Sequence, residues 1–163
     1  MATRFRSNVH DIEDVRQALE KIDTWIARQG PQALTGMTPL TDYSPEWATS
    51  GSAPSLGNGT ILGSYTTFLG MCLASIVWTP GSTTTFGTGT YSFTLPSLSA
   101  SDVRVEGQAR LYHSSPYSGI CIVEAGADVI GLIGAPATGL VAATVPWTWT
   151  NGDSISATIL YPI

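Results

Sequence analysis

Charge is scarce in this chain. Charged residues make up 12% of its 163 residues, whereas a typical soluble domain carries about 25%. A monomeric domain needs charge to cover its surface, so we expect much of this surface to lie against partners. The formal net charge is -5, and only Arg104 and Arg110 follow Arg28 as cations. Because nucleic-acid binders concentrate Lys and Arg against phosphate, the sequence argues against a nucleic-acid partner.

Cysteine and long apolar runs are scarce as well. The two cysteines, Cys72 and Cys121, lie in apolar stretches, and neither has a second Cys or a His at metal-ligand spacing. We expect buried free thiols in a reducing compartment, with a disulfide as the alternative. No run approaches 18 apolar residues, and the charged N-terminus lacks the apolar centre of a signal peptide. We expect a protein that is made in a cytoplasm and does not insert into a membrane. We expect it to bind no metal and no cofactor.

Groups suited to catalysis are also few. The two histidines are His10 and His113, and a hydrolytic triad would need His113 with Ser114 or Ser115 and an acid such as Asp128. No G-x-S-x-G turn accompanies them, and a Ser adjacent to a His in sequence seldom aligns with it as nucleophile and base. We therefore expect no catalytic residues and no enzyme, with a hydrolase using His113 as the alternative.

The charges that are present gather at the N-terminus. Residues 1–29 hold ten charged residues, and the remaining 134 residues hold nine. Acidic side chains near Asp11 and the cation Arg28 would complement the dipole of a helix between them. Gly30 and Pro31 then form a helix stop signal. The pattern predicts a helix over residues 11–28 within an N-terminal attachment module, residues 1–29.

The apolar residues of this helix follow a heptad repeat. Ile12, Leu19 and Ile26 occupy position a. Val15 and Ile22 occupy position d. A Leu at a followed by an Ile at d disfavours two strands and favours three or four. We predict a homotrimer whose interface contains these five residues, the alternative being an amphipathic helix packed on its own domain.

A proline-rich stretch follows at residues 30–59. Its prolines forbid helix and central strands, and they are Pro31, Pro39, Pro45 and Pro54. We expect an extended arm that wraps the following domain, with Tyr43 and Trp47 as its anchors.

Residues 60–163 show the period of two that is typical of β-strands. Residues 91–95 and 103–112 alternate between apolar and polar side chains. The apolar runs 120–124 and 129–133 predict one hairpin, and Asn151-Gly152 predicts another between residues 145–150 and 154–160. Short strands at this spacing predict a head domain with an antiparallel β-sandwich fold, jelly-roll-like. A trimer would bury strand edges that so few charges protect.

Two tryptophans are candidates for ligand contact. Trp147 and Trp149 would share one face of a strand, and exposed aromatic rings can stack on sugars. The pair predicts a glycan contact, and the alternative is that both rings pack in a core or a trimer seam.

Residues 40–96 resemble a motif that recurs in small virion proteins of tailed phages, especially phages of actinobacteria. The matching segments are TDY at 41–43, WATSG at 47–51, PSLGNGT at 54–60, GSTTTFGTG at 81–89 and FTLP at 93–96. Gly63, Tyr65 and the closing NGD at 151–153 also fit.

The resemblance implies a structural component of a bacteriophage virion, such as a minor tail protein, a tail fibre or a capsid decoration, and it brings no catalytic residues. We expect a trimeric appendage anchored to other virion proteins by its N-terminus. The alternative is a carbohydrate-binding adhesin that recognises a host cell-surface glycan.

Overall fold

The computed structural model describes residues 16, 17, 19–21, 23, 24, 37–135 and 139–163. The chain forms two compact units, residues Met1–Met37 and Thr38–Ile163. The described residues of the first unit are helical, with Arg16 Nε 4.0 Å from Glu20 Oε1 and Thr24 Oγ1 donating to the Glu20 carbonyl over 2.7 Å. The side chain of Leu19 is 55% exposed. Since Ile12, Val15, Ile22 and Ile26 lie outside the described residues, the coiled coil stays a prediction.

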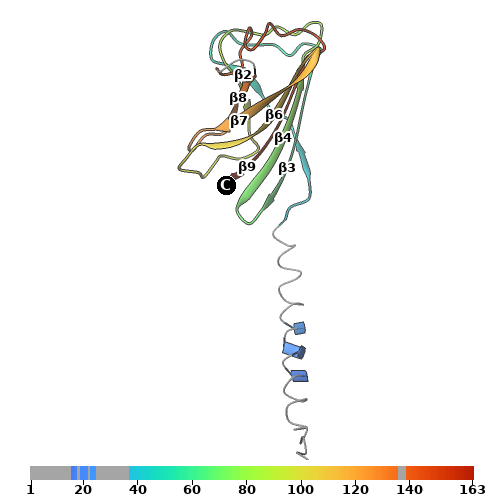
Figure 1. Ribbon diagram of the computed structural model, residues 1–163, viewed down its shortest axis with the longest axis vertical. Helices are drawn as coiled ribbons and strands as arrows, with labels where there is room; N and C mark the ends of the chain where they lie inside the picture. The colour runs from blue at the N-terminus through green and yellow to red at the C-terminus, as the bar shows by residue number, and fades with distance from the viewer. Residues whose placement is uncertain (1–15, 18, 22, 25–36, 136–138) are drawn as a thin grey trace, which may run out of the picture. The chain divides into compact units, whose positions relative to one another are not determined.

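The second unit is a single curled antiparallel sheet (Figure 1). Its described strands are β1 (Thr41–Tyr43), β2 (Trp47–Thr49), β3 (Thr60–Phe68), β4 (Met71–Thr79), β5 (Tyr91–Thr94), β6 (Val105–His113), β7 (Ser115–Val123), β8 (Val129–Gly134) and β9 (Ser154–Pro162). They lie in the order β1-β3-β4-β9-β6-β7-β8-β5-β2. The predicted mainly β, antiparallel head is confirmed. The division into two facing sheets is not found, because each central strand continues the ladder of its neighbours.

Side-chain alternation explains which face of the sheet is buried. Along β4, Cys72, Ala74, Ile76 and Trp78 are buried, while the residues between them point outward. Strand β9 repeats the pattern, and the long strand β6 shows the alternation that the sequence predicts. The apolar face of the curled sheet therefore encloses one core, in which inward side chains from both halves of the sheet meet.

The two predicted hairpins have different outcomes. Strands β7 and β8 pair antiparallel across the turn at residues 124–128, as predicted, with Cys121 opposite Leu132. Residues 145–150 form no strand, and β9 pairs with β4 and β6 instead. Gly152 does make a turn, with a φ of 94°. The prediction of the second hairpin was wrong. The side chain of Trp149 enters the core, so its backbone is not placed to pair with a neighbouring strand.

The arm is part of the sheet. Strand β1 pairs with β3, with Asp42 opposite Ser64, and β2 pairs with β5, with Ala48 opposite Ser92. Only residues 44–46 separate β1 from β2, so one continuous segment covers the outer edges of both β3 and β5. The compact unit accordingly begins at Thr38, within the stretch that the sequence assigned to a separate arm.

An aromatic cluster anchors this segment to the core. The ring of Trp47 lies 5.0 Å from that of Trp78 and 5.2 Å from that of Tyr91. Trp78 in turn contacts Trp149 at 5.4 Å. Such tilted and edge-to-face pairs each add about 0.5–1.5 kcal/mol beyond their buried area. The expectation that Trp47 anchors the arm agrees with these contacts.

Both cysteines are free and buried, as expected. Burial raises the pKa of Cys121 to about 11, and its Sγ lies 3.4 Å from the carbonyl oxygens of Gln108 and Thr158. Burial also raises the pKa of Cys72, an effect partly offset by a hydrogen bond with Tyr161. Since the thiolate is the reactive form, both groups are chemically quiet in the folded head.

We predict that the native protein does not react with Ellman's reagent at pH 8, because both thiols remain protonated and enclosed. In denaturant, two thiols per chain should react. The variant Thr148→Cys, at an exposed loop position, should add one thiol that reacts in the native state. Stoichiometric reaction of the native wild-type protein within minutes would contradict the burial of Cys72 and Cys121.

Candidate functional site

Backbone pairing holds two segments of the head together. Ser50 N donates to the Thr90 carbonyl over 3.0 Å, and Gly51 N donates to the Thr88 carbonyl over 2.9 Å. Further along, Ser55 and Thr85 form an antiparallel bridge. Residues 50–58 and 81–90 thus run side by side, and we call this pairing the hydroxyl clasp.

Side-chain hydroxyls and one amide complete the hydroxyl clasp. Asn58 Oδ1 accepts bonds from the backbone N and the Oγ1 of Thr83, both at 2.9 Å, and Asn58 Nδ2 donates to Ser82 Oγ over 3.1 Å. Gly57 has a φ of 59°, and a Cβ there would lie 2.5 Å from the Thr83 carbonyl oxygen. Gly57 and Thr83 therefore each have a role in holding this fold.

The one buried acid of the described head lies beside its histidine. His113 Nδ1 and Asp153 Oδ1 are 2.9 Å apart, and Asp153 is 3% exposed. The second oxygen of the same carboxylate accepts a bond from Thr150 N over 2.8 Å. The imidazole also stacks on Trp147, with ring centroids 5.0 Å apart and an angle of 25° between planes. The acid that the structure brings to His113 is thus Asp153, and not Asp128, which was named as an example for the alternative triad.

No hydrogen bond joins Ser114 or Ser115 to the His113 ring in the described part of the chain. The hydroxyl of Ser114 donates to the carbonyl of His113, so it is turned toward the backbone. Ser114 itself adopts a φ of 56° in the tight turn between β6 and β7. Asp153 closes the turn before β9 and orients the imidazole, which is a structural role. Sequence reasoning missed the pair because forty residues separate its members.

The two tryptophans predicted as glycan contacts differ in burial. Trp149 is 1% exposed and its Nε1 donates to the Val145 carbonyl over 3.2 Å, so this ring presents no face to a sugar. Trp147 is half-buried, with the rings of His113, Tyr117 and Trp149 at 5.0, 4.8 and 5.2 Å. The core alternative fits Trp149, whereas Trp147 packs against the core and keeps part of its surface exposed.

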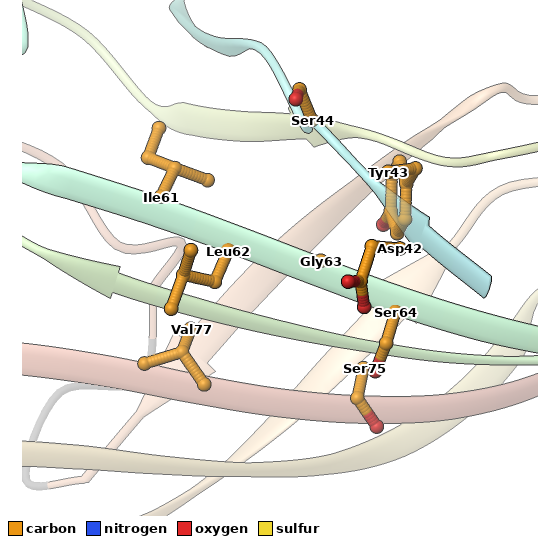
Figure 2. Close-up of a pocket in the computed structure, with 9 residues that line it drawn as sticks. All are labelled: Asp42, Tyr43, Ser44, Ile61, Leu62, Gly63, Ser64, Ser75 and Val77. Carbon is orange, nitrogen blue, oxygen red and sulfur yellow. The ribbon is translucent and has the colours of Figure 1, made fainter. Parts of the chain in front are cut away.

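A hollow of about 430 Å³ lies on the outer side of β1, β3 and β4. Figure 2 shows Asp42, Ser64 and Ser75 beside one another, next to the aliphatic side chains of Leu62 and Val77. The Asp42 carboxylate has no hydrogen bond or ion pair within the described part of the chain. An open hollow that combines a free carboxylate, hydroxyls and exposed aliphatic groups is suited to contact with another surface.

Neither metal sites nor membrane spans are found among the described residues. No group of three or more His, Cys, Asp or Glu side chains in that part of the chain is placed to hold a metal ion. No helix there is long and apolar enough to cross a membrane.

Comparison with known proteins found no protein family, no curated protein and no solved structure that matches this chain.

We predict that Asp153→Ala lowers the free energy of unfolding by about 1–3 kcal/mol, because Thr150 N and the His113 ring lose their buried partner. Chemical denaturation followed by tryptophan fluorescence measures the change. The control is Asp128→Ala, which removes the acid that the sequence offered to His113, and its effect should stay within about 0.5 kcal/mol. Equal effects of the two variants would contradict a structural role for Asp153.

Proposed function

We propose that the chain is a structural component of a bacteriophage virion, a trimeric appendage anchored by its N-terminal helix and projecting the β-rich head. The observation that carries the proposal is the motif over residues 40–96. Its segments contain the arm, the hydroxyl clasp and Trp47 of the aromatic cluster. Under this proposal, proteins that share these segments close their heads in the same way.

The outer face of the head supports a role in assembly. Strands β3, β4 and β9 contain no charged residue in their described length. On an antiparallel sheet with one buried face, the other face is ordinarily polar. Here it exposes Leu62, Leu73, Val77 and Leu160. Self-association would remove these side chains from water.

The arm changes where association would take place. Since β1 and β2 cover the edges of β3 and β5 within one chain, those strand edges need no second copy to protect them. The edges that a trimer would bury are then those of the short outermost strands β1 and β2. Contact between heads would use the outer faces of strands, together with the heptad of the N-terminal helix.

A carbohydrate-binding adhesin remains the competing function. The burial of Trp149 and the three rings around Trp147 weaken the argument that these two tryptophans contact a sugar. The hollow beside Asp42 would be its remaining contact surface on the described head. Binding of the purified protein to host cell-wall glycan, lost in Asp42→Asn, would favour the adhesin.

We predict that the full chain sediments as a trimer, at three times its 17.2 kDa mass. The variant Leu19→Asp should weaken the trimer at least tenfold, because it places a charge in the heptad seam. The matched control Gln17→Asp, on the opposite side of the heptad, should leave the trimer unchanged. Immunogold electron microscopy should place the protein on intact particles and lose the signal when residues 1–29 are deleted.

A monomer in analytical ultracentrifugation, together with virion incorporation that survives the deletion, would refute the proposal.

A further inference from the structure

The outward side of β3, β4 and β9 forms one continuous surface, which we call the uncharged face. Its outward residues are Leu62, Ser64, Leu73, Ser75, Val77, Ser156, Thr158 and Leu160. The exposed fractions of Leu62, Val77 and Leu160 are 66%, 40% and 42%. Its central hydroxyls bond to each other, with Ser75 Oγ 3.1 Å from Thr158 Oγ1. The polar atoms at its centre are thus already partnered, which lowers the cost of removing water there.

Opposite charges flank the uncharged face. On one side, Asp42 of β1 lies opposite Ser64 of β3 and lines the hollow in Figure 2. On the other side, Arg110 of β6 lies opposite Ser156 of β9 and lines a smaller hollow with Gln108 and Thr158. Both side chains point outward, because the flanking Tyr43 and Leu111 point into the core.

Neither charge has an ion-pair partner in the described part of the chain. Arg110 lies 5.7 Å from the ring centroid of Tyr112, a cation–π contact. The other head cation, Arg104, is paired with Glu124 at 2.7 Å and is not free for a second role. Asp42 has no cation near it, although Glu106 adds a second carboxylate to the same side of the face as Arg110.

Asp42 and Arg110 cannot reach each other within one head. Three strands lie between β1 and β6 in the sheet, which is about 19 Å along the sheet at the usual spacing between strands. Two copies can form this ion pair, because the Arg110 side of one head can approach the Asp42 side of the other.

We propose that the uncharged face is the surface through which heads of neighbouring copies pack, with Asp42 of each copy paired to Arg110 of the next. The inference rests on the proposed trimer and identifies the head surface that assembles it. Different sides of the face meet in each contact, and three such heterologous contacts close a ring. Apolar side chains supply the affinity, while the charge pair fixes the register and disfavours other packings.

A disulfide cross-link tests this arrangement in the full chain. The variant carrying both Asp42→Cys and Arg110→Cys, oxidised with copper phenanthroline, should give covalent trimers on a non-reducing gel. A bond within one head is excluded, because disulfides require Cα atoms within about 7 Å. The native Cys72 and Cys121 are buried and do not interfere. The matched control pairs Asp42→Cys with Thr148→Cys, at an exposed loop position off the face, and should stay monomeric on the gel.

The outcomes separate this inference from the proposed function. Covalent trimers in the Asp42/Arg110 variant alone support the packing of heads through the uncharged face. If the wild-type protein sediments as a trimer but the double variant stays monomeric, stops at dimers or links no better than the control, the inference is overturned and the trimeric appendage stands. A wild-type protein that sediments as a monomer overturns both.

Discussion

The head depends on one short segment that reaches both edges of its sheet. Thr38 bonds to the end of β3, with its N donating to the Thr67 carbonyl over 2.9 Å. A few residues later the same segment pairs with β5, and Thr94 N donates to the Glu46 carbonyl over 3.0 Å. Directly after Glu46, Trp47 enters the aromatic cluster. Backbone pairing therefore sets the path of the segment, and the partly buried indole of Trp47 adds apolar contact with the core.

Closure by this segment shapes what the surface can do. Since this segment covers the edges of β3 and β5, the edges of the sheet are the three-residue strands β1 and β2, and short edge strands offer little backbone for unwanted pairing. The surface that a partner would cover is the outward side of β3, β4 and β9. Its exposed leucines have no charged neighbours on their own strands. A virion component is compatible with this composition, since a protein that is assembled with other copies can hide such a face.

Local pattern made some of this structure predictable. Alternation along residues 103–112 predicted β6, and the apolar runs around a Gly turn predicted the β7–β8 hairpin. The apolar stretches around both cysteines predicted buried thiols. Each of these signals depends only on residues that are close in sequence, so it can be recognised from the sequence alone.

Contacts between residues that are distant in sequence were harder to predict. Asn151-Gly152 has the composition of a hairpin turn, yet β9 finds its partners in β4 and β6, which lie far away in sequence. Trp147 and Trp149 alternate as strand residues would, but an irregular backbone turns Trp149 into the core. The pairing of His113 with Asp153 left no local signal. The lack of charge in β3, β4 and β9 was visible in the sequence, although only the strand order shows that these three segments are adjacent.

The most direct test of this account is the stability of Trp47→Ala, compared with Leu40→Ala from the same segment. Loss of the partly buried indole should lower the free energy of unfolding by about 2–3 kcal/mol, less than the cost of removing a fully buried aromatic side chain. Leu40 is 72% exposed, so its truncation should cost less than about 0.5 kcal/mol. Equal stability of the two variants in chemical denaturation would contradict the claim that Trp47 holds the sheet closed.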